Sequence, residues 1–189
     1  MRPAPRLVAA IALWVCAVGG GLVAIASYEL RSGRAAEPRD RWPEDSSLSR
    51  SPDRPTLLLF AHPHCPCTRA SFAELEWIAS RAQDRLECWV VAVQPAGAPA
   101  DWIPENLGTS LAKVRADADG VEAARFDAHT SGQTLVYAPD GRLLFRGGIT
   151  GSRGHVGENA GRDAVMACAR GERPALDSTP VFGCSLATP

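Results

Sequence analysis

Hydrophobic and polar positions divide this chain into an apolar N-terminal run, a polar stretch and a region where helical and strand-like patterns alternate. Residues 7–28 are apolar or small throughout and carry no charge. Spanning a bilayer needs roughly 20 such residues. The pattern therefore predicts a transmembrane helix within residues 1–30. Arg2 and Arg6 precede the run, which favours a cytoplasmic N-terminus.

The polar stretch covers residues 31–55, which are rich in Arg, Ser, Asp and Pro and have no apolar periodicity. This composition predicts a flexible linker between the anchor and a domain at 56–189. An uncleaved signal anchor is favoured because the apolar run exceeds the usual length of a cleavable signal. Cleavage after Ala26 and lipidation at Cys16 are the alternatives. All three place the domain outside the cytoplasm, and the anchor predicts a single-pass protein of the cell inner membrane with a periplasmic domain.

Residues 56–189 predict an α/β domain, because strand-like runs alternate with amphipathic helical segments. A late pair of strands around the turn 138–141 predicts a hairpin, so a parallel core should carry an antiparallel edge. The expected strands are 56–61, 86–93, 113–116, 133–137 and 142–146, and the expected helices are 68–82, one from near Asp101, 121–126 and 159–169. The formal net charge of −1 gives no indication of nucleic acid as a partner.

The candidate chemistry lies between the first strand and the first helix of this domain, in the sequence His62-Pro63-His64-Cys65-Pro66-Cys67. A helix N-terminus offers unpaired N–H groups and partial positive charge, both of which favour thiolate over thiol. We expect Cys65 to be the attacking thiol and Cys67 the resolving thiol, with His64 beside them. A Cys-Pro-Cys disulfide closes a small ring, and a strained bridge favours oxidation or isomerisation of partner thiols.

The chain resembles the thioredoxin superfamily over roughly residues 55–170, and is most similar to its membrane-tethered, extracytoplasmic TlpA/ResA-type branch. More narrowly, it resembles proteins labelled RedB-like. The resemblance implies a thioredoxin-like central sheet flanked by helices. The segments on which it rests are 60–67, 114–117, 126–127, 135–142, 147–155 and 179–184.

The chain departs from the usual thioredoxin pattern at two places. Thioredoxins carry Cys-x-x-Cys, whereas here one residue separates the cysteines, so that His64 takes the place of the exposed nucleophile. The family also has a cis-proline just before the strand that begins at Gln133, where this chain has Ser131 and Gly132. The usual backbone docking of a substrate is therefore not expected to carry over unchanged.

A copper site is the alternative interpretation of the same region. Sco-type copper proteins, which are tethered thioredoxin folds, have a cysteine pair at the first helix and an Asp-His near the position of Asp127-Ala128-His129. Soft thiolates together with imidazoles select copper over calcium or magnesium. The candidate ligands are His62, His64, Cys65, Cys67 and His129.

Three further cysteines lie outside this motif. Cys184, close to the C-terminus, could fold back as a third thiol, acting as a resolving cysteine or a metal ligand. A loose tail thiol and a bridge to Cys168 are the alternatives. Cys88, in a strand, and Cys168, among helical alanines, are expected to be buried. The glycine-rich loop with Arg153 and His155 lacks a phosphate-binding motif and is expected near the cysteines.

These observations predict a membrane-anchored extracytoplasmic thiol–disulfide oxidoreductase that acts on protein thiols or disulfides through Cys65 and Cys67. This function requires no cofactor. The alternative is a Sco-like chaperone or sensor of copper or another soft metal that uses Cys65, Cys67 and His129. A non-catalytic thioredoxin-fold binding module is the third hypothesis.

Overall fold

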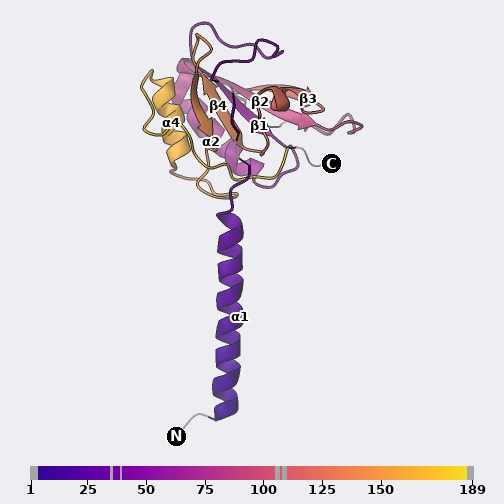
Figure 1. The fold of residues 1–189 in the computed structure, drawn as a ribbon, viewed down its shortest axis with the longest axis vertical. Helices are drawn as coiled ribbons and strands as arrows, with labels where there is room; N and C mark the ends of the chain where they lie inside the picture. The colour runs from indigo at the N-terminus through magenta and orange to yellow at the C-terminus, as the bar shows by residue number, and fades with distance from the viewer. Residues whose placement is uncertain (1–3, 35, 39, 105–106, 108–109, 187–189) are drawn as a thin grey trace. The chain divides into compact units, whose positions relative to one another are not determined.

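A computed structural model describes residues 4–34, 36–38, 40–104, 107 and 110–186 of the 189-residue chain (Figure 1). The chain forms two compact units, residues 1–31 and 32–189. The first unit is helical, and the second combines a sheet with helices.

The first unit is the helix α1 (Pro5–Glu29), in which no residue is buried. Pro5 occupies the first turn, where its missing N–H costs no hydrogen bond. Twenty-five residues rise about 38 Å, more than the ~30 Å thickness of a hydrocarbon core. Among the described residues, α1 is the one helix long and apolar enough to cross a membrane, and an N-terminal signal sequence would meet the same criteria.

The second unit is built on a five-stranded sheet in the order β3-β2-β1-β4-β5. The central β1 pairs parallel with β2, which pairs parallel with β3, while β4 lies antiparallel to both β1 and β5. The parallel core and the antiparallel edge hairpin agree with the sequence prediction. The strands are β1 (Thr56–Ala61), β2 (Glu87–Gln94), β3 (Lys113–Ala118), β4 (Gln133–Tyr137) and β5 (Leu143–Gly147).

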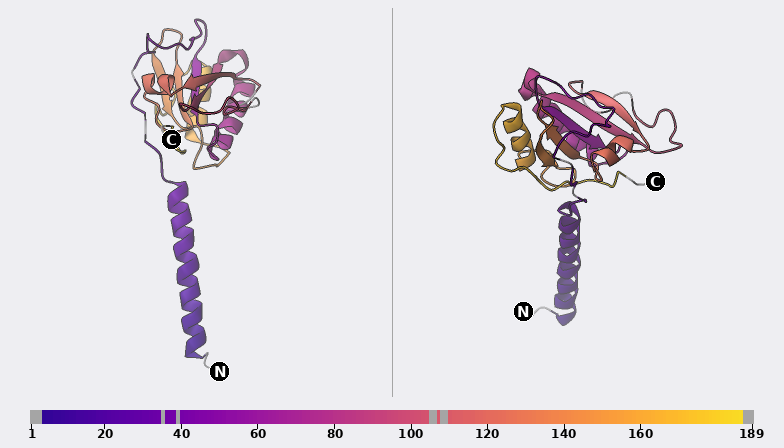
Figure 2. Two further views of the ribbon diagram at one scale, coloured as in Figure 1. Left: turned by 90° about the vertical axis from the view of Figure 1, so that its right-hand side faces the viewer. Right: turned by 45° about the horizontal axis from the view of Figure 1, so that its top comes forward.

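Helices cover both faces of this sheet (Figures 1 and 2). On one face, α2 (Thr68–Ala82) packs beside α4 (Ala160–Ala169), and Leu57 and Leu59 of β1 point toward them. On the other face, α3 (Val121–Arg125) lies over Leu58 and Phe60. The short 3-10 helix η1 (Gln83–Arg85) connects α2 to β2. The alternation of β1 side chains between two cores explains its uninterrupted apolar sequence.

The predicted elements agree with the structure within a few residues, with one exception. The expected helix near Asp101 is wrong for the part of this segment that the structure describes, where turns form instead. Trp102 N–H donates to the Pro99 carbonyl at 3.0 Å, and Leu107 N–H donates to the Pro104 carbonyl at 3.0 Å. Prolines at these positions favour turns, because each fixes φ and removes a helical donor.

Residues 32–55 are not the flexible linker that their composition predicted, because the described part of this segment packs on the α3 face of the sheet (Figure 2). Leu48 is buried, and the Trp42 ring stands edge-on to Phe126 at 5.1 Å. Trp42 N–H also donates to the Gly141 carbonyl at 2.8 Å. A few well-placed apolar side chains thus order a stretch whose average composition is polar. The domain therefore begins near residue 32 and not at 56.

Candidate functional site

Two consecutive turns carry the chain from the end of β1 to the start of α2 and hold the two cysteines of the motif. Cys65 N–H donates to the His62 carbonyl at 3.1 Å, and Thr68 N–H donates to the Cys65 carbonyl at 3.0 Å. Cys67 is the N-terminal capping residue of α2. The predicted position of the motif at the N-terminal end of this helix is therefore observed.

The segment just before β4 fixes these turns from the side. His62 N–H donates to Ser131 Oγ at 2.9 Å, and Ser131 Oγ lies 2.9 Å from Thr68 Oγ1. Thr68 Oγ1 also lies 3.1 Å from the His62 carbonyl oxygen. Gly132, with a positive φ of 93°, donates its N–H to the Phe60 carbonyl at 2.8 Å. Buried hydroxyls of Ser131 and Thr68 thus fasten the motif to the strand pair β1–β4.

The C-terminal segment folds back over the same place. Ser131 N–H donates to the Cys184 carbonyl at 2.8 Å, and Leu186 N–H donates to the His129 carbonyl at 2.8 Å, which forms an antiparallel bridge. This pairing brings Cys184 Sγ to 2.8 Å from Cys65 Sγ. The sequence offered Cys184 as a third thiol that could reach the active face, and the structure places it there and not beside Cys168.

Cys65 is 4% exposed, although its position in the motif suggested an accessible thiol. Burial raises its pKa, but hydrogen bonds outweigh burial and the net shift is downward. The donors are the Cys184 thiol, the backbone amides of Cys184 and Cys67, and the Thr68 hydroxyl. Each donor stabilises the thiolate more than the thiol. Cys65 is therefore the thiol that ionises first at this site.

The two neighbouring thiols have shifts in the opposite direction. Burial and the negative charge of Cys65 raise the pKa of Cys67, against a hydrogen bond from Arg153. Burial, together with the hydrogen bond that Cys184 donates to Cys65, raises the pKa of Cys184 to about 11. Arg153 Nη1 also donates to the Gly183 carbonyl at 2.8 Å. The glycine-rich loop therefore lies beside the cysteines, as expected, and Arg153 is the residue that contacts their surroundings.

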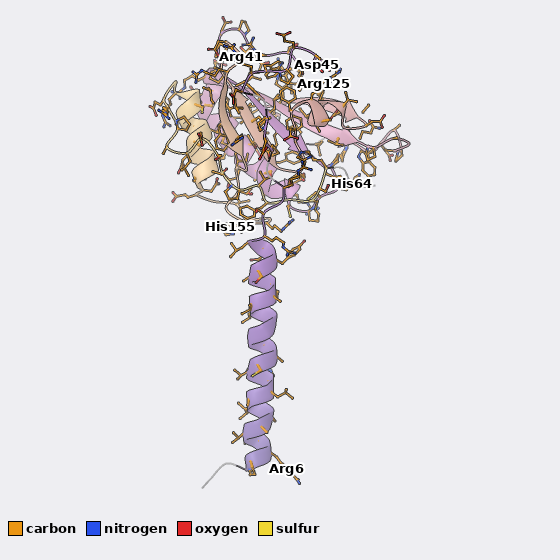
Figure 3. The ribbon with its side chains drawn as sticks, viewed as in Figure 1. Arg6, Arg41, Asp45, His64, Arg125 and His155 are labelled. Atoms are coloured by element: carbon orange, nitrogen blue, oxygen red, sulfur yellow. The ribbon has the colours of Figure 1, made fainter. Side chains whose placement is uncertain are left out.

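The two histidines of the motif lie beside Trp102. His64 is exposed, as its place in the motif suggested, and its Nε2 lies 3.1 Å from the Trp102 carbonyl (Figure 3). Burial, followed by the charge of His64, lowers the pKa of His62. His62 is therefore mostly neutral at pH 7 and does not act as a cationic neighbour of the thiols.

His129 does not join the thiols in a ligand cluster. Its Nε2 lies 2.6 Å from Asp127 Oδ1, and its ring lines a pocket of about 340 Å³ together with Arg34, Thr130 and Arg153. Across the described ranges, no three His, Cys, Asp or Glu side chains are grouped so that they could hold a metal ion. The set that the copper alternative required, His62, His64, Cys65, Cys67 and His129, is therefore not assembled in this conformation.

Cys88 and Cys168 are buried, as expected, among apolar side chains of the α2 face. Burial raises the pKa of Cys88 to about 12 and that of Cys168 to about 11. His155 is exposed in the glycine-rich loop (Figure 3). These three residues therefore lie outside the candidate site.

Sequence reasoning did not identify Ser131, Thr68 or Gly183 as parts of the site. The one available signal for them was the polar pair Ser131-Gly132 in the place of the family's proline. Hydroxyls and backbone amides carry no motif of their own. Their role depends on which distant segments meet in the folded chain.

Comparisons with known proteins agree with the topology. No family model matches the chain, and no curated protein matches it significantly. The chain is similar to an uncharacterized conserved protein from Geobacillus kaustophilus, with 19% identity and a TM-score of 0.60 over 85% of this chain and 93% of that one. A hypothetical protein from Sinorhizobium meliloti has 20% identity and a TM-score of 0.59 over 83% and 94%.

A secreted disulfide oxidoreductase from Mycobacterium tuberculosis, homologous to E. coli DsbE, matches more distantly, with 22% identity and a TM-score of 0.44 over 62% of this chain and 81% of that one. That similarity is too low to support an argument about function. The sheet order, the parallel β1–β2–β3 core, the antiparallel β4 and β5, and helices on both faces form a thioredoxin-like fold. The predicted fold class is therefore confirmed.

Proposed function

We propose that this protein is a membrane-anchored, extracytoplasmic thiol–disulfide oxidoreductase whose attacking thiol is Cys65. The observation that supports the proposal most directly is the environment of Cys65. A thiol of low exposure at the start of a helix has its pKa lowered by four donors, and a second thiol lies within reach. A thiolate is the species that attacks a disulfide.

In the proposed reaction, the Cys65 thiolate attacks one sulfur of a disulfide in a partner protein. A mixed disulfide forms, the partner's other sulfur leaves as a thiolate, and a second cysteine of this protein then attacks Cys65 Sγ. The partner gains two electrons and ends as a dithiol, and this protein is left with an internal disulfide. The reverse sequence oxidises a partner dithiol. Cys67 and Cys184 are the candidates for the second cysteine, because both interact with Cys65.

The test is to trap the mixed disulfide. In the full chain carrying Cys67→Ser and Cys184→Ser together, no thiol remains beside Cys65 to complete the exchange. Disulfide-linked adducts with extracytoplasmic proteins should accumulate and should disappear on reduction. The triple variant that also carries Cys65→Ser is the matched control. Equal adducts in the two variants, or adducts in neither, would refute the assignment of Cys65.

Anchoring by α1 is the second part of the proposal. The helix is apolar along its length and contains no buried residue, as a lipid-facing helix requires. We expect the intact chain to stay with the membrane fraction after washing with alkaline carbonate, and its Cys65 to be accessible only to reagents that reach the extracytoplasmic side. Recovery of a shortened, unlipidated chain in the periplasmic fraction would show that the segment is cleaved.

The copper alternative is tested separately from the thiol chemistry. It requires Cys65, Cys67 and His129 to bind one ion, which would need a rearrangement of the Asp127–His129 pair. If the reduced full chain binds Cu(I), and His129→Ala weakens that binding as much as Cys65→Ser does, the metal function replaces the one proposed here. The redox proposal expects His129→Ala to leave mixed-disulfide formation nearly unchanged.

A further inference from the structure

The C-terminal segment, residues 177–186, is fastened at both ends across the edge of the sheet that carries the thiols. At its start, Thr179 N–H donates to the Arg146 carbonyl of β5 at 3.2 Å. At its end, the backbone pairs with residues 129–131 through the two bonds described above, and Leu186 inserts into the core on the α3 face. Val181, between the two ends, is 1% exposed. The segment is thus a docked extension of the chain, held by two isolated β-bridges, that presents one thiol.

From this arrangement we propose that Cys184, presented by the C-terminal segment, is the resolving thiol for Cys65, so that the oxidised protein holds a Cys65–Cys184 disulfide and not a Cys65–Cys67 disulfide. The inference rests on the proposed function and makes it more specific. It assigns the second cysteine of the reaction to a residue 119 positions away in the sequence.

Backbone pairing fixes the register of Cys184 against the motif. The Ser131 N–H and the His129 carbonyl lie in the segment just before β4, and both form hydrogen bonds with the C-terminal segment. Gly183 makes this approach possible, because a Cβ added there would lie 1.9 Å from the Ser131 carbonyl oxygen. No side chain fits at that distance. The glycine before the cysteine therefore serves to position Cys184 Sγ against Cys65 Sγ.

The charge on Cys65 determines when Cys184 can attack. While Cys65 is a thiolate, Cys184 donates its S–H to it, and burial and this bond hold the pKa of Cys184 at about 11. Once Cys65 has entered a mixed disulfide, its negative charge is gone and it no longer accepts that hydrogen bond so strongly. The part of the rise in the pKa of Cys184 that comes from Cys65 is then lost, while the part that comes from burial, the largest single cause, remains. Formation of the mixed disulfide thus activates the thiol that resolves it.

The reaction balances as two successive exchanges. The Cys65 thiolate attacks the disulfide of an extracytoplasmic partner protein, which acts as oxidant, and the partner's first sulfur leaves as a thiolate. Cys184 loses its proton to solvent and attacks Cys65 Sγ, which forms the Cys65–Cys184 bond and releases the second sulfur. Two electrons pass from the cysteine pair to the partner. A separate dithiol reductant must regenerate the pair.

The docked segment also limits access to Cys65, which is 4% exposed. A partner strand that paired with the edge at 129–131 would need the same N–H and carbonyl groups that residues 184 and 186 occupy. The segment must therefore shift before a protein disulfide reaches Cys65. In the docked state, Cys184 occupies the position beside Cys65 that a partner's sulfur would take.

Peptide mapping distinguishes the two possible disulfides. Trypsin cuts after Arg50, Arg69 and Arg170 but not at Arg–Pro bonds, so Cys65 and Cys67 share the peptide 51–69 and Cys184 lies in 171–189. The full chain in detergent is oxidised with a small-molecule disulfide, and free thiols are blocked before digestion. We expect the two peptides to be linked, and the link to persist in Cys67→Ser. A bridge inside 51–69 with Cys184 blocked, or loss of the link in Cys67→Ser, would overturn the proposal.

A kinetic test separates this inference from the proposed function. An aromatic disulfide as oxidant should release one aromatic thiolate when Cys65 attacks and a second when Cys184 resolves. Cys184→Ser should slow the second release by at least about tenfold and preserve the first. If Cys67→Ser slows the second release and Cys184→Ser does not, this inference fails while the proposed function stands. Absence of a first release in the unaltered chain would refute the proposed function itself.

Gly183→Ala tests the docking without removing a thiol. The added Cβ should displace the segment, so that alkylation of Cys65 becomes faster by several-fold and the yield of the linked peptides falls. Gly151→Ala is the matched control, because its Cβ would meet only Asn159 Cβ at 3.9 Å. Equal alkylation rates and equal link yields in the two variants would overturn the proposed role of the segment.

Discussion

Cys65 and Cys88 are buried almost equally, at 4% and 5% exposure, yet their thiols differ in acidity. Cys88 lies in β2 among apolar side chains, where burial raises its pKa to about 12. Cys65 lies between a helix start and the C-terminal segment, where donors outweigh burial and lower its pKa. Exposure alone therefore does not determine the acidity of a thiol. What distinguishes the two thiols is the number of N–H, O–H and S–H groups that face the sulfur.

This contrast also explains why the chain can place a reactive sulfur out of contact with solvent. A buried thiolate without donors costs several kcal/mol of desolvation, whereas preorganised donors offset that cost. The donors of Cys65 come from two separate parts of the chain, namely residues 67–68 and Cys184, which contributes both its thiol and its backbone.

The largest effect is expected in the alkylation of the two thiols at neutral pH. The pKa of Cys88 is about 12 and that of Cys65 lies below the ordinary 9.0, so they differ by at least about 3 units. Each unit is tenfold in thiolate, so the thiolate fraction of Cys65 should exceed that of Cys88 by at least about 1000-fold. A more acidic thiolate is a weaker nucleophile, which offsets about half of this difference on the logarithmic scale, so Cys65 should react at least about 30-fold faster. Peptide-resolved rates with a small alkylating reagent, in a Cys67→Ser background, measure the ratio. Similar rates for the two cysteines would remove the basis of the comparison.

A buried ion pair tests whether a buried carboxylate, like a buried thiolate, needs a partner that stabilises its charge. Glu74 and Arg162 are 1% and 9% exposed at their side chains, with Oε2 3.5 Å from Nη1. Arg162→Ala should lower the free energy of unfolding by about 3–5 kcal/mol, because it leaves a buried carboxylate without its counter-charge. Urea denaturation of the full chain measures the change.

The control for that prediction is Arg170→Ala, which breaks an exposed pair with Glu172. Surface pairs contribute little, so the unfolding midpoint should hardly move. If Arg162→Ala lowers the free energy of unfolding as little as Arg170→Ala does, other groups stabilise the buried Glu74 carboxylate. The contrast between the two buried thiols would then not apply to buried carboxylates.

Leu48 tests whether burial without polar partners orders the segment that the composition predicted to be flexible. It is 6% exposed within the α3-face core, so Leu48→Ala should destabilise the domain by about 2–3 kcal/mol. Leu176→Ala, at a side chain that is 50% exposed, is the matched control and should change stability by less than about 0.5 kcal/mol. Equal effects in thermal unfolding would mean that residues 32–55 are a linker after all.

The smallest effect concerns a single donor. Cys184→Ala removes the S–H that stabilises the Cys65 thiolate, so the pKa of Cys65 should rise by about one unit, because a hydrogen bond to a charged group contributes about 1.5 kcal/mol or somewhat more. The alkylation rate increases as pH rises through the pKa, so its inflection should move to higher pH in Cys184→Ala. The inflection and not the rate is compared, because the substitution also opens the site.

Cys184→Ser keeps a donor at the same position and is the control for that shift. Its inflection should lie between those of the unaltered chain and Cys184→Ala. An inflection that is the same in all three would show that Cys184 does not stabilise the Cys65 thiolate.

Local sequence was sufficient to determine the elements and the position of the motif. The apolar run 56–61 forms β1, the amphipathic pattern 68–82 forms α2, and the cysteines fall in the turns between them. These features depend on side chains a few residues apart, through backbone geometry and burial periodicity. The parallel core and the antiparallel edge could be predicted as well, because strands joined through helices run parallel and strands joined by a tight turn run antiparallel.

Only the tertiary structure decided which groups surround Cys65. Its thiol neighbour Cys184 is 119 residues away, and Ser131, which ties down the motif, comes from the segment before β4. The packing of residues 32–55 and the separation of His129 from the thiols also depend on contacts between segments that are distant in the sequence. Hydrogen bonds act over about 3 Å, whereas sequence patterns report only on neighbours along the chain. The acidity of a buried thiol is therefore set by contacts that exist only once distant segments have folded together.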